Sequence, residues 1–131
     1  MIISNLNLVR NQVKKLGANI DIGSRLARDE MAMALTQLAK AEIRTDNGSP
    51  YAGGPPVNRS GDLRRSIKAQ KRTVGFANYT AIVGPTVIYG RTLELGFSNG
   101  NKYPYMKPAW KKFRYVAPSI IKKHLSGRGI K

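Results

Sequence analysis

The residue types that carry most enzyme chemistry are scarce and scattered in this chain. There is one histidine, His124, near an end of the chain that we expect to be loosely ordered, and there is no cysteine. A histidine-assisted nucleophile, a multi-histidine metal site or a thiolate site is therefore not expected within one chain. The acidic residues do not pair either. Asp29 and Glu30 are adjacent and therefore diverge on a helix, whereas Asp62 and Glu94 are far apart in sequence. We therefore expect neither an enzyme nor a cofactor.

A phosphate-binding loop is also missing from the sequence. Gly53 and Gly54 are followed by two prolines, whereas such a loop needs a Lys-Ser or Lys-Thr pair and then a helix. We therefore do not expect nucleotide hydrolysis.

The charge is strongly unbalanced, since 23 Lys and Arg against 7 Asp and Glu give a formal net charge of +16. A positive field of this size implies an acidic partner, which could be nucleic acid, anionic lipid or an acidic protein surface. Basic residues in the last third of the chain alternate with the aromatic residues Tyr103, Tyr105, Trp110 and Tyr115. That mixture would suit a single-strand binder. We prefer the alternative that the aromatic residues are core and the lysines form the solvated back of a helix.

Length and composition predict one globular domain over residues 1–131, because 41% of the residues are hydrophobic and 23% charged. The first residues lack the basic segment and apolar run of a signal peptide, and no run of about 18 apolar residues occurs. We therefore expect a soluble protein that is made in the cytoplasm and has no membrane partner.

A long amphipathic helix is predicted from about residue 4 to about residue 44. Apolar residues recur at steps of three and four in its first half, at Leu6, Val9, Val13, Leu16 and Ile20. We expect a break or bend between Gly17 and Gly23, where Asp21 or Ser24 could cap a second start. The apolar stripe is either a docking face for neighbouring subunits or the cover of one face of a sheet, and we prefer the second.

Residues 45–58 are rich in Gly, Pro and Asn, which predicts a long flexible loop. After it, short apolar runs bounded by turn residues predict a small antiparallel sheet of about four strands, at residues 66–74, 80–83, 87–89 and 92–95. A terminal helix should begin near Pro108, kink or restart at Pro118, and end in a frayed tail at about residues 126–131. The predicted fold class is α+β, with the terminal helix packed on the sheet.

Three short motifs stand in this second half of the chain. They are RSGDLRRSI at residues 59–67, LELG at residues 93–96 and PYMKPA at residues 104–109. Their order and spacing resemble those of the small neck and tail-completion (head–tail joining) proteins of long-tailed bacteriophages. The departures from that family's pattern are modest. Ser60 stands where Thr is usual, Phe97 and the loop after it replace a Thr, and Tyr105 replaces Phe.

The resemblance implies a structural virion protein that works without catalysis. Copies would form a ring in the neck, between a head-closure or connector protein and the tail terminator, and DNA would pass through the ring. The protein would be in the virion, and in the host cytoplasm during assembly.

The basic surface would face acidic neighbouring proteins or touch the DNA end transiently. We prefer acidic proteins because a strongly basic lumen would retain DNA. A small nucleic-acid-binding protein and a minor tail assembly protein remain the alternatives.

The resemblance also assigns roles to individual residues. Gly61 would permit a tight turn, Leu63 and Ile67 would point into the core, and Arg64 or Arg65 would bind a partner or form an ion pair with Glu94. The candidate partner or subunit contacts are Arg59, Arg64, Arg65, Glu94 and Lys107. The residues expected to shape the motifs are Gly61, Leu63, Ile67, Gly96, Pro104 and Pro108.

Overall fold

The structure of the protein is a computed structural model that describes residues 2–44, 51–57, 61–73, 75–76 and 78–126. Its elements, in chain order, are α1 (Ile2–Ala41), α2 (Asp62–Ser66), β1 (Lys68–Thr73), β2 (Tyr79–Gly84), α3 (Ile88–Leu95) and α4 (Met106–Ser126). The expected combination of a long N-terminal helix, an antiparallel sheet and a C-terminal helix is confirmed.

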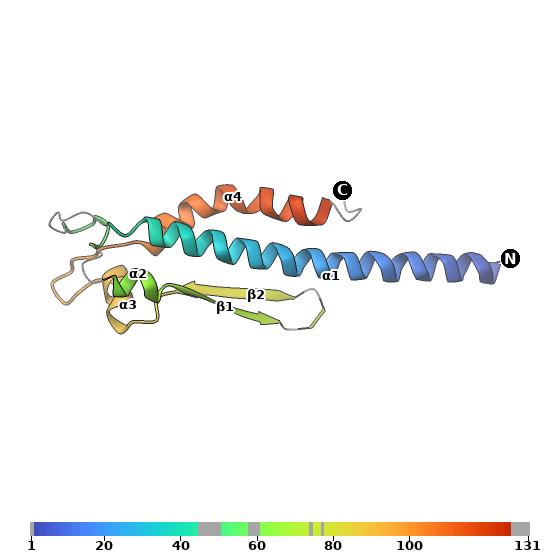
Figure 1. Cartoon of the computed structure of the whole chain (residues 1–131), viewed down its shortest axis with the longest axis horizontal. Coiled ribbons are helices and arrows are strands. Elements are labelled where there is room, and N and C mark those ends of the chain that lie inside the picture. Colours follow the sequence, from blue (N-terminus) through green and yellow to red (C-terminus); the bar gives the residue numbers. More distant parts are fainter. Residues whose placement is uncertain (1, 45–50, 58–60, 74, 77, 127–131) are drawn as a thin grey trace.

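The long helix α1 forms the axis of the molecule (Figure 1). Helix α4 runs antiparallel along one side of α1, the β1–β2 hairpin lies along the other side, and α2 and α3 lie near the C-terminal end of α1. The N-terminal part of α1 extends beyond both the hairpin and α4. The terminal helix was expected to pack on the sheet, but its most extensive contact is with α1.

The predicted break in the N-terminal helix is wrong, because α1 is continuous over its 40 residues. Gly17 and Gly23 each cost about 1 kcal/mol relative to Ala, but they keep their backbone N–H groups, and no proline interrupts the ladder. Contacts with the hairpin also hold this part of the helix. Asp21 does not cap a second helix start; its carboxylate accepts a hydrogen bond of 2.8 Å from the Tyr79 hydroxyl of β2.

The sheet has two strands in the described residues, not four. Strands β1 and β2 pair antiparallel from Lys68 opposite Gly84 to Thr73 opposite Tyr79. The segments expected to be the third and fourth strands belong instead to α3. Runs of three or four β-branched and apolar residues are compatible with either structure, and contacts made far along the chain decide here in favour of a helix.

The core lies where the C-terminal half of α1 meets α2 and the start of α4. Its buried members are Ala39, Ile43, Leu63, Ile67, Tyr105 and Ala109. Helix α4 begins two residues before Pro108, so this proline stands in the first turn as predicted. The helix continues through Pro118 and does not restart there. Pro118 is exposed, so water can reach the carbonyl that loses its N–H donor.

Part of the segment predicted as a flexible loop is held to the body. The Arg44 N–H donates a bond of 2.8 Å to the Pro56 carbonyl, and the Gly53 N–H donates one of 2.7 Å to the Lys102 carbonyl. The remainder of that loop, residues 45–50 and 58, lies outside the described residues, as do residues 127–131 of the predicted tail.

Candidate functional site

The second and third motifs meet at the carboxylate of Glu94. One oxygen, Oε2, accepts hydrogen bonds from the backbone N–H groups of Tyr105 at 2.8 Å and Met106 at 3.0 Å. The other, Oε1, accepts a bond of 3.0 Å from the backbone N–H of Lys107. These are groups at the start of α4 that have no partner within the helix, so Glu94 caps α4 from the last turn of α3.

The expected ion pair between Glu94 and Arg64 is replaced by this cap. Arg64 lies exposed on α2, and Arg65 forms an ion pair of 2.6 Å with Asp62. Both carboxylate oxygens of Glu94 are bound to backbone N–H groups of α4, which already compensate its negative charge. The pairing with an arginine was one of the roles considered for Glu94 from the sequence, and the cap on α4 was not among them.

The first motif supplies a turn and two core residues. Gly61 has φ of 81°, a conformation that side chains with a Cβ rarely adopt, and it precedes α2 as the predicted tight turn requires. Leu63 and Ile67 are 4% and 1% exposed, which confirms that they point into the core. The Ser66 carbonyl accepts two bonds from Thr86, through its N–H and its hydroxyl, and this ties α2 to the segment before α3.

The third motif places a fully buried tyrosine beside Glu94. Tyr105 is 0% exposed, and its hydroxyl donates a bond of 2.9 Å to the Gly90 carbonyl of α3. Burial, and the nearby Glu94 charge, raise the pKa of Tyr105 well above its usual value, so it stays protonated as a donor. Pro104 and Pro108 are half-buried on either side of it. Gly96, with φ of 117°, ends α3 just before the chain turns toward this motif.

Three of the candidate contact residues carry accessible charge beside this cluster. Lys107 and Arg64 are exposed, Arg65 is exposed in its pair with Asp62, and Arg59 lies outside the described residues. The three motifs therefore converge at one end of the molecule, with Leu63, Ile67 and Tyr105 in the core and the charges of Arg64 and Lys107 on the surface.

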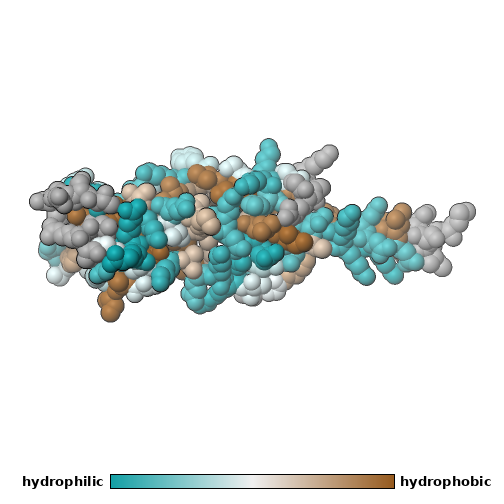
Figure 2. Space-filling view, in the orientation of Figure 1, coloured by the Kyte–Doolittle hydropathy of each residue, from teal (hydrophilic) through white to brown (hydrophobic). Residues whose placement is uncertain are grey.

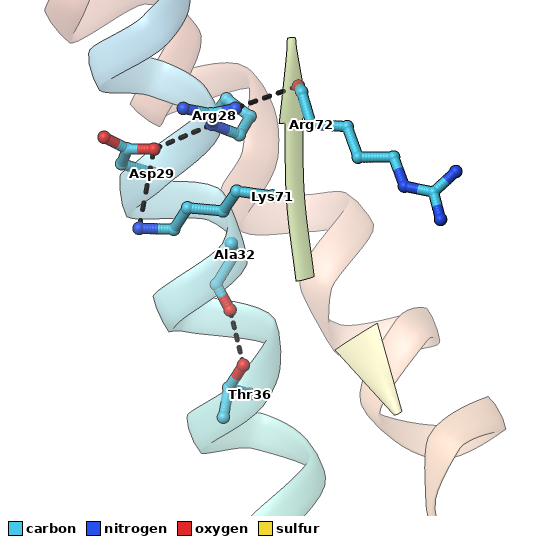
Figure 3. Close-up of polar contacts among 6 residues, drawn as sticks. All are labelled: Arg28, Asp29, Ala32, Thr36, Lys71 and Arg72. Carbon is cyan, nitrogen blue, oxygen red and sulfur yellow. Dashed lines mark hydrogen bonds and ion pairs between the residues drawn. The ribbon is translucent and has the colours of Figure 1, made fainter. Parts of the chain in front are cut away.

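A second polar cluster, which the sequence did not indicate, attaches the hairpin to α1 (Figure 3). Arg28 donates to Asp29 at 2.7 Å and to the Arg72 carbonyl of β1 at 3.0 Å, and Lys71 lies 3.5 Å from Asp29. Partial burial raises the pKa of Asp29, but Arg28 and Lys71 together lower it by more, so the pKa lies below its usual value. The side chain of Arg72 points away from α1, and only its carbonyl takes part.

An open apolar groove of about 480 Å³ lies between α1, β2 and α4. Met31 and Leu35 of α1, Val83 of β2, and Trp110, Phe113 and Ile121 of α4 are among its lining residues. Trp110 is 55% exposed and Ile121 is 40% exposed. Exposed apolar area of this kind often marks a contact surface.

The aromatic residues considered for nucleic-acid stacking do not form one exposed platform. Tyr105 belongs to the core and Tyr103 is half-buried, where it packs edge-on against Phe97 with ring centroids 6.0 Å apart. Trp110 lines the groove, and Tyr115 is 78% exposed. The preferred interpretation, that the aromatic residues serve the core, therefore holds for Tyr105 but not for Tyr115.

Neither a metal cluster nor a membrane span is found in the described part of the chain. No three His, Asp or Glu side chains there lie together as a metal site requires. Among the described helices, none is long and apolar enough to cross a bilayer.

Comparison with known proteins identifies a family. The model of the HK97-gp10-like family, described as "Bacteriophage HK97-gp10, putative tail-component", matches residues 9–96. No curated protein and no solved structure matches the chain. The matched range includes the first two motifs and Glu94, whereas the backbone groups that Glu94 caps lie just beyond it.

Proposed function

Because the chain belongs to the HK97-gp10-like family of bacteriophage tail components, we propose that it is a structural protein of the phage neck, without catalytic activity. In this proposal, copies of the chain form a ring that joins the DNA-filled head to the tail and lets the DNA pass. The family match carries the proposal, since it spans most of α1, the whole hairpin and α3.

The use of the motif residues supports a mechanical role. Glu94 and Tyr105 carry the side chains in the motifs that are best suited to acid–base chemistry, and both are engaged in joining α3 to α4. An enzyme would instead need its acid and its phenol directed toward a substrate. Here the motifs give rigidity at one end of the molecule and leave cations on its surface.

The proposed neighbours are a head-closure or connector protein on one side and the tail terminator on the other. The net charge of +16 would be compensated if their facing surfaces are acidic. Arg64 and Lys107, exposed beside the motif cluster, are the cations that we assign to one of these contacts. A transient contact with the DNA end is compatible with this ring, but a lumen with many phosphate contacts would slow ejection.

Nucleic-acid binding is the second candidate, and the surface of the hairpin favours it. Five of the six residues of β1 are exposed, and Lys68, Lys71 and Arg72 are among them. Such a strand would bind phosphates without reading sequence, and the affinity would fall steeply with added salt. This candidate predicts binding by the free protein, which a joining protein does not need.

Deletion of the gene from its phage or prophage tests the proposal. Electron microscopy of the particles should show filled heads beside separate, finished tails, and the wild-type gene supplied in trans should restore whole virions. Heads without any tails would assign the protein to tail assembly instead. Normal infectious virions would contradict the structural role and favour the nucleic-acid candidate.

A further inference from the structure

The first half of α1 presents an apolar stripe that the described part of the chain leaves exposed. Leu6, Val9, Val13 and Leu16 are 48%, 52%, 63% and 44% exposed. Their spacing of three and four residues places them on one face of the helix. In the second half of α1, by contrast, Ala27, Ala32 and Ala39 are buried. The preferred expectation, that the stripe covers a sheet, is therefore wrong for residues 6–16, and the docking alternative is favoured.

The stripe lies on the part of α1 that projects from the body of the molecule, and we call its residues 6–16 the rod. The tip of the hairpin reaches only as far as Gly17, where an added Cβ would lie 3.6 Å from the ring of Phe76. Figure 2 shows the N-terminal part of α1 extending as a narrow rod from the body, with a hydrophobic patch where the rod meets the body. Residues 6–16 span about 15 Å at 1.5 Å per residue, enough to lay three helical turns on another surface.

The chain also carries a matching apolar surface, the groove between α1, β2 and α4. Arg28 is the one charged residue among the described residues that line it, and its guanidinium is already bound to Asp29 and to the Arg72 carbonyl. The groove therefore offers Trp110, Ile121 and Leu125 to an apolar occupant without an uncompensated charge.

The rod cannot fill the groove of its own chain. Because α1 is one continuous helix that itself lines the groove with Met31 and Leu35, residues 6–16 point away from it along the same axis. Residues 6–16 can therefore enter only the groove of another molecule.

The distribution of charge indicates which molecule that is. Two copies that each carry +16 repel one another, so they can associate only through surfaces poor in charge. The stripe itself carries no charge, and the polar residues Gln12 and Asn19 lie along one of its edges. Arg10 lies at the other edge, where its long side chain can keep the charge in water while the stripe is covered, and Lys14 and Lys15 lie farther round the helix. An acidic partner would bind the lysine face instead.

We propose that residues 6–16 of α1 in one copy dock in the groove between α1, β2 and α4 of the next copy. The interface joins two different surfaces, so repeating it around a rotation axis closes a ring. This inference rests on the proposed ring function and identifies the lateral contact within it. It also accounts for both exposed apolar surfaces with a single interaction.

Disulfide cross-linking tests the docking, since the chain has no cysteine of its own. The double variant Val13→Cys/Ile121→Cys carries one cysteine on the rod and one in the groove. Lys123 of α4 pairs with Glu30 of α1, so position 121 lies about 15 residues along α1 from position 13, which is over 20 Å and too far for a bond within one chain. Non-reducing gels should therefore show a ladder of linked chains. The control Lys15→Cys/Ile121→Cys, with the cysteine on the far face, should give single chains.

The same variants are also examined in particles made by a phage that lacks its own copy of the gene. A ladder there supports the docking, and only single chains in both the purified protein and the particles would overturn it. A second pair, Leu16→Cys/Leu125→Cys, repeats the test if the first variant does not fold. A ladder with purified protein but no chain in the particles would contradict the neck function and leave the docking supported.

A mixing experiment tests that the contact joins unlike surfaces. The variant Val13→Gln/Leu16→Gln has a defective rod, and Trp110→Gln/Ile121→Gln has a defective groove. Each should be monomeric alone by light scattering, and an equimolar mixture should form dimers, since each supplies the surface that the other lacks. Formation of large assemblies by either variant alone would overturn the inference.

Discussion

The carboxylate of Glu94 lies 2.8 Å from the backbone nitrogen of Tyr105 and bonds the two following N–H groups as well. This cap joins α3 to α4 across the turn that separates the second and third motifs. Glu94→Ala should lower the free energy of unfolding by about 1–2 kcal/mol, because it leaves helix N–H groups without their acceptor and removes a charge that favours the helix N-terminus. Urea denaturation of the variant and the wild type measures this difference in the free energy of unfolding.

The matched control for the cap is Arg64→Ala, which should change stability by less than about 0.5 kcal/mol, since Arg64 is exposed. If Arg64→Ala cost as much as Glu94→Ala, and the double variant cost no more than either, the two residues would be acting as a pair and the cap would not account for the role of Glu94.

The sequence was sufficient to predict those elements that depend on residues close together in the chain. The 3.6-residue periodicity of α1, the glycine turn at Gly61, the apolar positions Leu63 and Ile67, and the start of α4 near Pro108 all follow from residue types within a few positions of each other. The hairpin followed from alternation and turn residues in the same way.

The sequence was insufficient where distant contacts decide the structure. Residues 87–95 have strand-like composition, but α3 is fixed by the Tyr105 hydroxyl, 15 positions from its acceptor Gly90, and by the cap at Tyr105, 11 positions from Glu94. The anchor of the hairpin, Arg28 bonded to Arg72, spans 44 positions. The exposed half of the α1 stripe has the same pattern as the buried half, so only the position of the hairpin tip and of α4 tells them apart.

Gly90 should be intolerant of a side chain although it lies in a helix. A Cβ there would lie 2.6 Å from Pro85 Cβ and 3.0 Å from the Tyr105 hydroxyl. An exposed helical Gly→Ala change usually stabilises by about 1 kcal/mol, but here overpacking should reverse the sign and cost about 1–3 kcal/mol. Thermal unfolding of Gly90→Ala measures the effect.

Gly84→Ala is the control for Gly90, because nothing lies within 4 Å of the Cβ that it would add and its φ is not positive. This change should be nearly neutral. Equal destabilisation by both variants would mean that the loss does not come from the contact with Pro85 and Tyr105.

The Asp29 cluster should make stability depend on pH. The pKa of Asp29 is lower in the folded protein than its ordinary value of 3.8, so its ion pairs contribute fully above that value and the contribution is lost as the pH falls through the lowered pKa. At pH 7, Asp29→Asn should cost about 0.5–1 kcal/mol, a small value because the cluster is partly exposed. The difference between wild type and variant should shrink as the pH is lowered from about 5 toward 3.

Two measurements check the role of charge in this cluster. The loss in Asp29→Asn should be smaller when Lys71→Gln is already present, because one of the ion pairs is then gone. Added salt should reduce the loss as well, since the side chains are accessible to ions. A difference that stayed constant from pH 7 to pH 3 would contradict an electrostatic origin.

The cations beside the motif cluster should matter for joining but not for folding. Arg64→Glu and Lys107→Glu each reverse an exposed charge, so the free protein should unfold within about 0.5 kcal/mol of wild type. If these residues face an acidic neighbour in the neck, each reversal places like charges together and weakens the contact by at least about tenfold. Complementation of the deleted phage should then give fewer joined particles, counted by electron microscopy.

Lys122→Glu, an exposed charge reversal near the far end of α4, is the control that should leave joining unchanged. An equal loss with Lys122→Glu would mean that net charge, and not the motif end of the molecule, governs docking.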